Sequence, residues 1–478
     1  MIFLALFIGI LLPLASGMMM LRLFEGSRIL LTRIERVSIG WITGITVSMF
    51  LLFFANAFLH MPLSKLWMSA VQVVLLIILF VLMRVRHLSA FPSSQVHSLR
   101  SEWRKIPMWL RGILIGMGFW SLVKIAAMLF LLLATPTFFD DAIENWNVRG
   151  KIFFIDQSIS LMLPHETEPG GVSSYPPTVP LAKTWVSSLA GRWSEPVING
   201  IHILWYFAAI GIVFSILRRA AGLLWALIGS YALMSLPLYL MHGANPYADV
   251  FLSCHIAAAV GMLFCAERST EHEVRMGFLR LCALLTALLP FTKNEGLLIY
   301  LPPLILLIAF VLFRFQRAAV LSSKEFLRTA LLFAVPLALV AGPWILFKWM
   351  NGLPFGNAKA VAGFSIGWQE NVLRSVTINT VFEGNWLLLF PLIIVLLAIV
   401  RRESVRIGGV ILLFIGIVYF GQMFLYLFTT LSSEALEQTG YARGLVHIMP
   451  LIVILTTLLT RKALEYWGIA TSHEDHLA

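Results

Sequence analysis

Two adjacent carboxylates stand in a short polar element, FFDDAIENWNVRGK, that follows a long apolar stretch of the chain. If this element is helical, Asp141, Asn145 and Arg149 lie four residues apart and share one face. A carboxylate beside an amide and a guanidinium could act as a general base next to groups that bind hydroxyls or phosphate. The alternative is that Asp140 and Asp141 only stabilise a helix N-terminus, although the tryptophan and the basic residues Arg149 and Lys151 are not needed for a cap.

A second polar element, SSYPPTVPLAK, lies further along the same segment between apolar stretches. Its three prolines disfavour a regular helix, and Tyr175 within it offers an aromatic face and a hydroxyl. The element is therefore predicted to be a rigid loop over a cavity. The alternative is an ordinary proline-rich turn.

The turn HGANPYAD places a further carboxylate at the start of an apolar stretch. Asp249 could ligate a metal, bind sugar hydroxyls or only cap the helix that follows it. Tyr247 belongs to the same turn and is expected to contact a substrate. His255, six residues after Asp249, is predicted to be packed or to face a pore.

Charged residues also interrupt the long apolar stretch from Leu281 to Phe313, in the element TKNEG. The apolar residues before this element span only about 16 Å as a helix, so Lys293 and Glu295 would lie within a membrane that the stretch enters. Ionisable side chains at that depth face an aqueous cavity or pair with each other, and they commonly have a function. A simple ion pair between Lys293 and Glu295 is the alternative.

The last polar element is YARGLVHIMP, in which Arg443 and His447 are four residues apart at the start of an apolar stretch. This spacing places both side chains on one face of a helix. A guanidinium at the level of lipid headgroups is suited to a phosphate. The alternative is an interfacial arginine that only extends its charge towards water.

The elements that must position these residues are transmembrane helices. Of the 478 residues, 59% are hydrophobic and only 12% are charged, against roughly 25% charged residues in a soluble domain. Apolar stretches of about 20 residues, the length of one membrane span, recur along the chain. We therefore predict an all-α, polytopic integral membrane protein with about 13 spans, near residues 2–21, 38–59, 66–83, 112–134, 198–217, 221–241, 249–266, 277–291, 296–313, 329–347, 385–400, 407–430 and 445–460.

The charges between these spans indicate the orientation of the protein. If the spans alternate, most of the 35 Lys and Arg residues fall on one side, which the positive-inside rule makes the cytoplasmic side. The net charge of +11 therefore reflects orientation and contact with membrane lipids, and it does not indicate a nucleic-acid partner. The polar elements fall mostly on the opposite, outer side. The first stretch is predicted to be a span with an outer N-terminus, because no basic residue precedes it as in a signal peptide.

The order of the polar elements resembles the GT-C superfamily of integral-membrane glycosyltransferases, especially its protein O-mannosyltransferases and lipid A aminoarabinose transferases. The resemblance covers roughly residues 112–460. It rests on the acidic element with its tryptophan and basic residues, the Tyr-Pro-Pro element, an Asp after an Asn-Pro-Tyr-Ala turn, a Lys-x-Glu-Gly break and a late Arg with His. Three spans precede the acidic element, whereas in the simplest family layout it follows the first span.

The resemblance implies an inverting transfer of a sugar from a polyprenyl-phosphate donor to a glycan, lipid or protein acceptor. Asp141 or Asp140 would be the general base on the acceptor hydroxyl, and Asp141 is preferred because it opens the face described above. Some members use a divalent cation such as Mg²⁺ or Mn²⁺ and others do not, so metal ligands and cofactors stay undecided. Lys293 and Arg443 would neutralise the departing phosphate. The residues expected to contact substrates are Asp249, Arg149, Lys151, Tyr175, Tyr247, Lys293, Glu295, Arg443 and His447.

The polar elements also divide the chain into three expected parts. Residues 1–111 would form a three-helix segment with a basic cytoplasmic loop, and residues 112–348 a GT-C-like catalytic core whose first outer loop spans 135–197. Residues 349–478 would supply further helices, outer loops and a short cytoplasmic tail. The three cysteines lie in apolar stretches without CxxC spacing, so they predict neither disulfides nor a thiolate metal site.

Two other classes of membrane protein fit parts of this pattern. A transporter or flippase of lipid-linked saccharides would also have many spans, intramembrane charge and a broken helix, but no inverted repeat is evident. An O-antigen ligase or polymerase relies in its family on arginines and a histidine in large outer loops. The transferase interpretation requires Asp141 or Asp140 to face one outward cavity with Asp249 and Arg443, on the periplasmic side of a bacterial cytoplasmic membrane.

Overall fold

Backbone hydrogen bonding determines the secondary structure, because a segment inside lipid must satisfy its own N–H and C=O groups. The structure, a computed structural model, describes residues 2–89, 99–138, 141–163, 166, 170–355 and 366–468, and within these ranges the chain forms helices and no strand. Eleven of the described helices are long and apolar enough to cross a membrane, or twelve spans if one bent pair is counted. The eleven are built on α1 (Ile2–Glu25), α2 (Arg33–Leu59), α3 (Lys65–Val85), α5 (Met108–Ala134), α9 (Ile201–Ala221), α12 (Asp249–Arg268), α13 (His272–Leu288), α14 (Leu301–Arg317), α15 (Ser323–Met350), α19 (Glu403–Phe428) and α21 (Gly440–Tyr466).

The predicted all-helical, polytopic class is confirmed, and helical structure lies at each predicted span. One of these positions is a bent pair in place of a straight helix. The pair consists of α10 (Leu223–Ser235) and α11 (Pro237–Ala244), which meet at an angle of 72°. Leu236 between them has an extended backbone conformation, as residues before proline commonly do.

A second predicted span is shorter than the sequence indicated. Residues 385–400 were expected to cross the membrane, but α18 (Leu389–Val400) begins four residues later. Leu387 and Leu388 have positive φ angles of 48° and 61°, which a right-handed helix cannot contain. The 12 residues of α18 reach about 18 Å, less than the hydrocarbon thickness of a bilayer.

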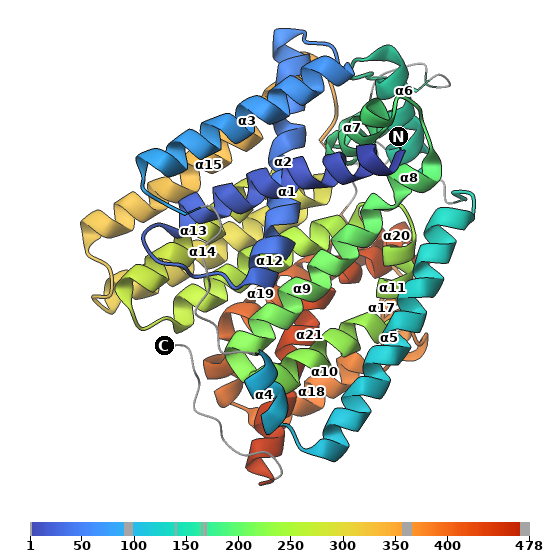
Figure 1. The fold of residues 1–478 in the computed structure, drawn as a ribbon. Coiled ribbons are helices and arrows are strands. Elements are labelled where there is room, and N and C mark those ends of the chain that lie inside the picture. Colours follow the sequence, from blue (N-terminus) through green and yellow to red (C-terminus); the bar gives the residue numbers. More distant parts are fainter. Residues whose placement is uncertain are drawn as a thin grey trace.

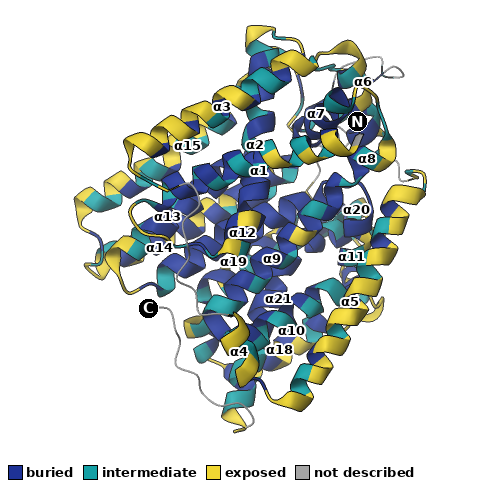
Figure 2. Cartoon of the chain, in the orientation of Figure 1, coloured by how far each residue is buried: buried dark blue, intermediate teal, exposed yellow. Residues whose placement is uncertain are grey.

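Burial separates central helices from peripheral ones (Figure 2). In the most apolar 18-residue windows of α12 and α21, 100% and 94% of the residues are buried, whereas in those of α5 and α15 only 17% and 11% of the residues are buried. The peripheral helices turn large apolar side chains outward, among them Phe119 on α5 and Leu339 on α15. A surface of this kind is suited to lipid. The two helices that carry Asp249 and Arg443 are therefore shielded at the centre of the bundle.

The segments between spans gather at two ends of the bundle (Figure 1). α6 (Arg149–Asp156), α7 (Thr178–Ala190) and α8 (Glu195–Asn199) lie together at one end, at the upper right of the view. α4 (Leu99–Lys105) lies at the opposite end. Following the charge pattern, we call the first the outer end and the second the inner end.

The proline-rich element of the first outer loop is partly helical, so the prediction of an irregular loop there is wrong in its second half. η2 (Val172–Ser174) is a single 3₁₀ turn, and α7 begins at Thr178. Pro180 is tolerated in the first turn of α7, because the N–H that proline lacks would have no helical partner at this position. The irregular part is confined to Tyr175 and the two prolines that follow it.

The leading helices share the hydrophobic core of the other helices. α1 and α2 approach each other closely, because a Cβ atom on Gly44 would collide with the carbonyl oxygen of Pro13. Further in, Thr46 on α2 hydrogen-bonds Nε2 of His255 on α12 at 2.9 Å. His255 is fully buried, so its predicted packing is confirmed. The proposed division of the chain at residue 111 stays a prediction.

Buried ion pairs fix the α1–α2 turn at the inner end. Glu25, at the end of α1, accepts a hydrogen bond from Arg36 at 2.8 Å and two more from backbone N–H groups of the turn. Glu35 on α2 pairs with Arg219 on α9 at 2.8 Å. We call Glu25, Arg36 and the neighbouring Arg22 the inner network. It attaches the first two spans to each other without reaching the outer end.

Candidate active site

Asp249 is the first residue of α12, and the chain reaches it through the bent pair and a short turn. α11 packs against α9, α12 and α21, so this turn ends among central helices. The Asp249 side chain is consequently completely buried. A carboxylate favours the N-terminus of its helix, but a buried charge of this kind is costly unless other groups compensate it.

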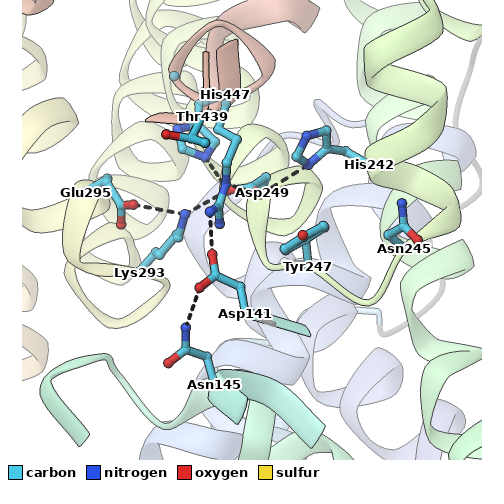
Figure 3. A network of polar contacts seen from close by, with 12 residues as sticks. Asp141, Asn145, His242, Asn245, Tyr247, Asp249, Lys293, Glu295, Thr439 and His447 are labelled. Carbon is cyan, nitrogen blue, oxygen red and sulfur yellow. Dashed lines mark hydrogen bonds and ion pairs between the residues drawn. The ribbon is translucent and has the colours of Figure 1, made fainter. Parts of the chain in front are cut away.

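Four side chains supply that compensation (Figure 3). Oδ1 of Asp249 accepts hydrogen bonds from Lys293 Nζ and His447 Nε2, each at 2.7 Å. Oδ2 accepts one from Arg443 Nε at 3.2 Å, and Nδ1 of His242 lies 3.1 Å from the same oxygen. Since both oxygens of Asp249 are engaged by side chains from other segments, the residue does more than cap its own helix.

Asp141 contacts the other side of Arg443. It immediately precedes the π-helical turn η1 (Ala142–Val148), where Asn145 donates to its Oδ1 at 3.1 Å. Its Oδ2 accepts a hydrogen bond from Arg443 Nη1. The Asp141 side chain is 40% exposed, whereas Arg443 is 25% exposed and Asp249 is sealed from solvent. Asp140 lies outside the described residues.

Lys293 lies at the break between two spans, after η3 (Leu289–Phe291) and before the π-helical turn η4 (Gly296–Tyr300). Besides Asp249, its ammonium contacts Oε1 of Glu295 at 2.9 Å. Burial raises the pKa of the Glu295 carboxyl, but the charges of Lys293 and His447 together with hydrogen bonds to the carboxylate outweigh this effect and leave the pKa below its ordinary value. Glu295 is therefore a carboxylate, and its Oε2 has no hydrogen-bond partner among the described residues. The simple ion pair of the sequence interpretation is present, and Asp249 extends it.

Aromatic residues hold the cationic side chains in place. The guanidinium of Arg443 lies 5.0 Å above the ring centroid of Tyr247. The ring of His242 packs against the same tyrosine, with the ring centroids 5.2 Å apart and the planes tilted by 36°. On the other side of the cluster, the hydroxyl of Tyr300 lies 2.9 Å from His447 Nδ1. His447 thus bridges Asp249 and Tyr300, and its orientation is fixed at both ring nitrogens.

Tyr175 and Arg149 belong to the wall of this region. Arg149 is buried and donates to the backbone oxygen of Tyr175 at 2.8 Å, and the rings of Trp146 and Tyr175 meet edge to face at 5.9 Å. Burial lowers the pKa of Arg149 to about 9. Burial also raises the pKa of Tyr175, and the charge of Glu295 adds to this effect. Arg149 thus positions the tyrosine that was expected to line the pocket.

Lys151 lies on α6, exposed to solvent. Over the residues that the structure describes, no contact joins it to Asp141, Asp249 or Arg443. Substrate contacts by Arg149 and Lys151 therefore stay predictions.

A buried lysine that the sequence interpretation did not single out connects the outer segments. Lys183 on α7 donates to the side-chain oxygen of Asn147 in η1 and, at 3.3 Å, to that of Asn199 on α8. Both amides in turn donate to Thr137 Oγ1. Burial holds the pKa of Lys183 well below its ordinary value of 10.5. This arrangement fixes the turn that begins beside Asp141.

Other contributors were also missed by the sequence interpretation. His242 stands in the quoted turn HGANPYAD but was not assigned a role, and its position before an Asn-Pro-Tyr turn was the available signal. Tyr300 and Gln422 had no such signal. Gln422 donates to the Tyr300 hydroxyl at 3.2 Å from a helix more than a hundred residues away in the chain.

Among solved structures, the chain is similar to ArnT from Cupriavidus metallidurans. The crystal structure of that protein bound to undecaprenyl phosphate matches with a TM-score of 0.52 at 17% identity, covering 75% of this chain and 62% of that chain. The apo structure matches with a TM-score of 0.50 at 15% identity, covering 73% and 61%. The chain shares the fold of ArnT over about three-quarters of its length. It spans about three-fifths of the length of the ArnT chain. No protein-family model matches the sequence, and no curated protein matches it.

Within this ArnT-like fold, the predicted elements meet at one place. Asp141, Asp249, Lys293, Glu295, Arg443 and His447 form a continuous chain of ion pairs and hydrogen bonds, which we call the outer network. Its members are sealed from solvent around Asp249 and open at Asp141 and Arg443. An exposed carboxylate beside fixed cations is an arrangement that can accept a proton while stabilising a phosphate.

The sequence left a divalent cation undecided, and the two aspartates of this site do not fit one. The guanidinium of Arg443 contacts both Asp141 and Asp249, so both carboxylates already have a cationic partner. The oxygens of Asp249 already accept from nitrogen donors. Over the described ranges of the chain, no group of three His, Cys, Asp or Glu residues could hold a metal ion.

Proposed function

We propose that this protein is a glycosyltransferase that moves a sugar from a polyprenyl-phosphate donor to a hydroxyl of a glycan, lipid or protein at the outer face of the bacterial cytoplasmic membrane. The observation that carries the proposal is the bridge of Arg443 between the exposed Asp141 and the buried Asp249. ArnT, whose fold is similar, has been solved with undecaprenyl phosphate bound. The same type of ligand would bring a phosphate to the outer end of this bundle.

Asp141 is the proposed general base. It is the more exposed of the two carboxylates that contact Arg443, and its Oδ1 accepts from a neutral amide. Asp249 is not suited to this role, because its oxygens are engaged by Lys293, Arg443 and His447. Asp249 instead fixes these donors in position. The neighbouring Asp140 remains the alternative base.

The proposed reaction is an inverting displacement. The acceptor oxygen attacks the anomeric carbon of the donor sugar as its proton passes to Asp141, and the bond from that carbon to the phosphate oxygen breaks. Arg443 and Lys293 are the cations that would stabilise the negative charge gained by the phosphate, with charge-assisted hydrogen bonds of the kind that guanidinium and ammonium groups form. Tyr175, Tyr247 and Glu295 would contact the sugar or the acceptor.

The decisive experiment replaces Asp141 with asparagine, which keeps the size of the side chain and removes its basicity. General-base catalysis contributes about 100-fold or more to a rate, so Asp141→Asn should abolish glycan modification in cells. Mass spectrometry of surface glycans and lipid-linked intermediates measures this loss, with a deletion strain as reference.

Two matched variants control this experiment. Asp140→Asn changes the neighbouring carboxylate and identifies which of the two is the base. Glu144→Gln removes a carboxylate from the adjoining turn and should leave the glycans unchanged. Wild-type glycan mass in a strain that carries abundant, inserted Asp141→Asn and Asp140→Asn proteins would contradict the transferase assignment.

A further inference from the structure

Arg443 is the member of the outer network with two acidic partners of very different burial. Its Nε bonds to Asp249, which is sealed from solvent, and its Nη1 bonds to Asp141, which is 40% exposed. The central carbon of its guanidinium lies 5.0 Å from the ring centroid of Tyr247. The side of Arg443 towards Asp249 is therefore buried, whereas the side towards Asp141 is open.

This asymmetry determines which contact a ligand can replace. Lys293 and His447 are each only 2% exposed and are held by Asp249. A phosphate that enters from the exposed edge therefore meets Arg443 before the other cations. It competes with Asp141 for Nη1, while Asp249 and Tyr247 keep the guanidinium in its place.

We propose that Arg443 is a shared counter-ion that passes from Asp141 to the phosphate of the lipid donor, so that donor binding releases Asp141 to act as the base. This proposal rests on the proposed transferase function. In the free protein Arg443 occupies the oxygen of Asp141 that would accept the proton. Once the phosphate takes the guanidinium, the hydrogen bond from Asn145 is what remains of the hydrogen bonds to the Asp141 side chain among the described residues.

The charges at this site balance through such a step. Before transfer, Asp141 and the donor phosphodiester each carry one negative charge. During transfer the acceptor proton neutralises Asp141, and the phosphate that leaves as a monoester gains the second negative charge. The total charge around Arg443 is unchanged, so no charge is created without a partner in this partly desolvated site. Because donor binding frees Asp141 from Arg443, the lipid donor binds before the acceptor is activated, and the reaction is ordered.

A double-mutant cycle on binding tests this competition without turnover. The probe is undecaprenyl phosphate, and its affinity is measured for the full-length protein in detergent or nanodiscs. Asp141→Asn removes the competing charge and should tighten binding by about threefold to fivefold, the range for one partly exposed ion pair. Arg443→Ala should weaken binding. In the Arg443→Ala background, Asp141→Asn should have no further effect, because the contested guanidinium is gone.

Matched variants separate this competition from a general effect of negative charge. Glu144→Gln removes a carboxylate three residues from Asp141, in the turn η1, and should leave the affinity unchanged. Tighter binding by Asp141→Asn that persists without Arg443, or an affinity unchanged by Asp141→Asn, overturns the shared counter-ion. If the wild-type protein does not bind undecaprenyl phosphate at all, the proposed function itself is wrong.

Discussion

Two of the buried ion-pair networks among the described residues each centre on one carboxylate, but they differ in where the partners of that carboxylate come from. Glu25 in the inner network pairs with Arg22 and Arg36, and the three residues lie at the facing ends of two consecutive helices. Asp249 in the outer network draws its partners from the ends of three other helical segments. The inner network joins two helices that are consecutive in the sequence, whereas the outer network joins segments that are far apart in the sequence.

Exposure separates the networks further. Both arginines of the inner network are 5% exposed and Glu25 is sealed. The outer network runs from complete burial at Asp249 to 40% exposure at Asp141. Breaking a fully buried pair leaves an uncompensated charge, so the inner network can only stabilise the fold. A network with one open edge can exchange a partner, and this is what a binding site requires.

The largest effects on stability and turnover are expected when the central carboxylate of each network is neutralised. Asp249→Asn and Glu25→Gln should each lower the free energy of unfolding by about 3 kcal/mol, because each leaves buried cations without their anion. Only Asp249→Asn should lower turnover per folded molecule, by about 100-fold, since it releases Lys293 and Arg443 from their positions. Thermal unfolding and initial transfer rates, normalised to monodisperse protein, measure the two effects. An equal loss of turnover in Glu25→Gln would show that the networks are not functionally distinct.

Lys183 is a third buried basic group to compare with the two networks, because its hydrogen-bond partners are neutral amides and not carboxylates. The pKa of Lys183 lies well below 10.5 in the folded protein. At a pH between this lowered pKa and 10.5, the Lys183 side chain is protonated in the unfolded chain and neutral in the folded protein. The contribution of Lys183 to the free energy of unfolding therefore rises with pH and levels off near 10.5, by up to about 1.4 kcal/mol per pH unit. Lys183→Met lacks this titration.

The measurement for Lys183 is the difference in unfolding temperature between wild type and Lys183→Met as a function of pH. This difference should move in favour of the wild type as the pH rises from neutral towards 10. The subtraction removes the contribution of Arg149, whose pKa is also lowered by burial. A difference that stays constant with pH would mean that Lys183 remains charged inside the fold.

The smallest effect is expected at Lys151, which lies outside both networks. Its side chain is exposed on α6, so Lys151→Ala should change stability by less than about 0.5 kcal/mol. Turnover at limiting donor should also match the wild type if the residue makes no substrate contact. A clear rise in KM for the donor would restore Lys151 to the binding residues that the sequence suggested.

Hydropathy and charge predicted the fold well, because a bilayer imposes both helix length and backbone hydrogen bonding on a chain. Each predicted span contains helical structure. The shortened α18 could not be foreseen, since the left-handed angles at Leu387 and Leu388 occur in residues that favour helices. The bend at Leu236 had a visible cause in Pro237, but periodicity alone does not distinguish a kink from a break.

The sequence singled out the charged residues of the outer network, but it gave neither their connections nor the contributions of His242 and Tyr300. The charged residues of the outer network stood out because charge is rare in apolar surroundings. The bridge of Arg443 between two aspartates depends on how α21 packs beside α12, which no local pattern encodes. The expected common face of Asp141, Asn145 and Arg149 is only partly present. Asn145 contacts Asp141 from within a π-helical turn, while Arg149 is directed towards Tyr175.

The central position of α21 also bears on how the protein is made. Asp249 lies on α12, and Lys293 lies in the segment after α13. The helices α12 and α13 pack together and leave the ribosome one after the other. Their ion pair lowers the cost of placing either charge in the membrane before α21 is synthesised. Arg443 and His447 then arrive with α21. Under the proposed function, a nascent chain that still lacks α21 has no Arg443 or His447 and is inert, so transfer begins only once this last central helix is in place.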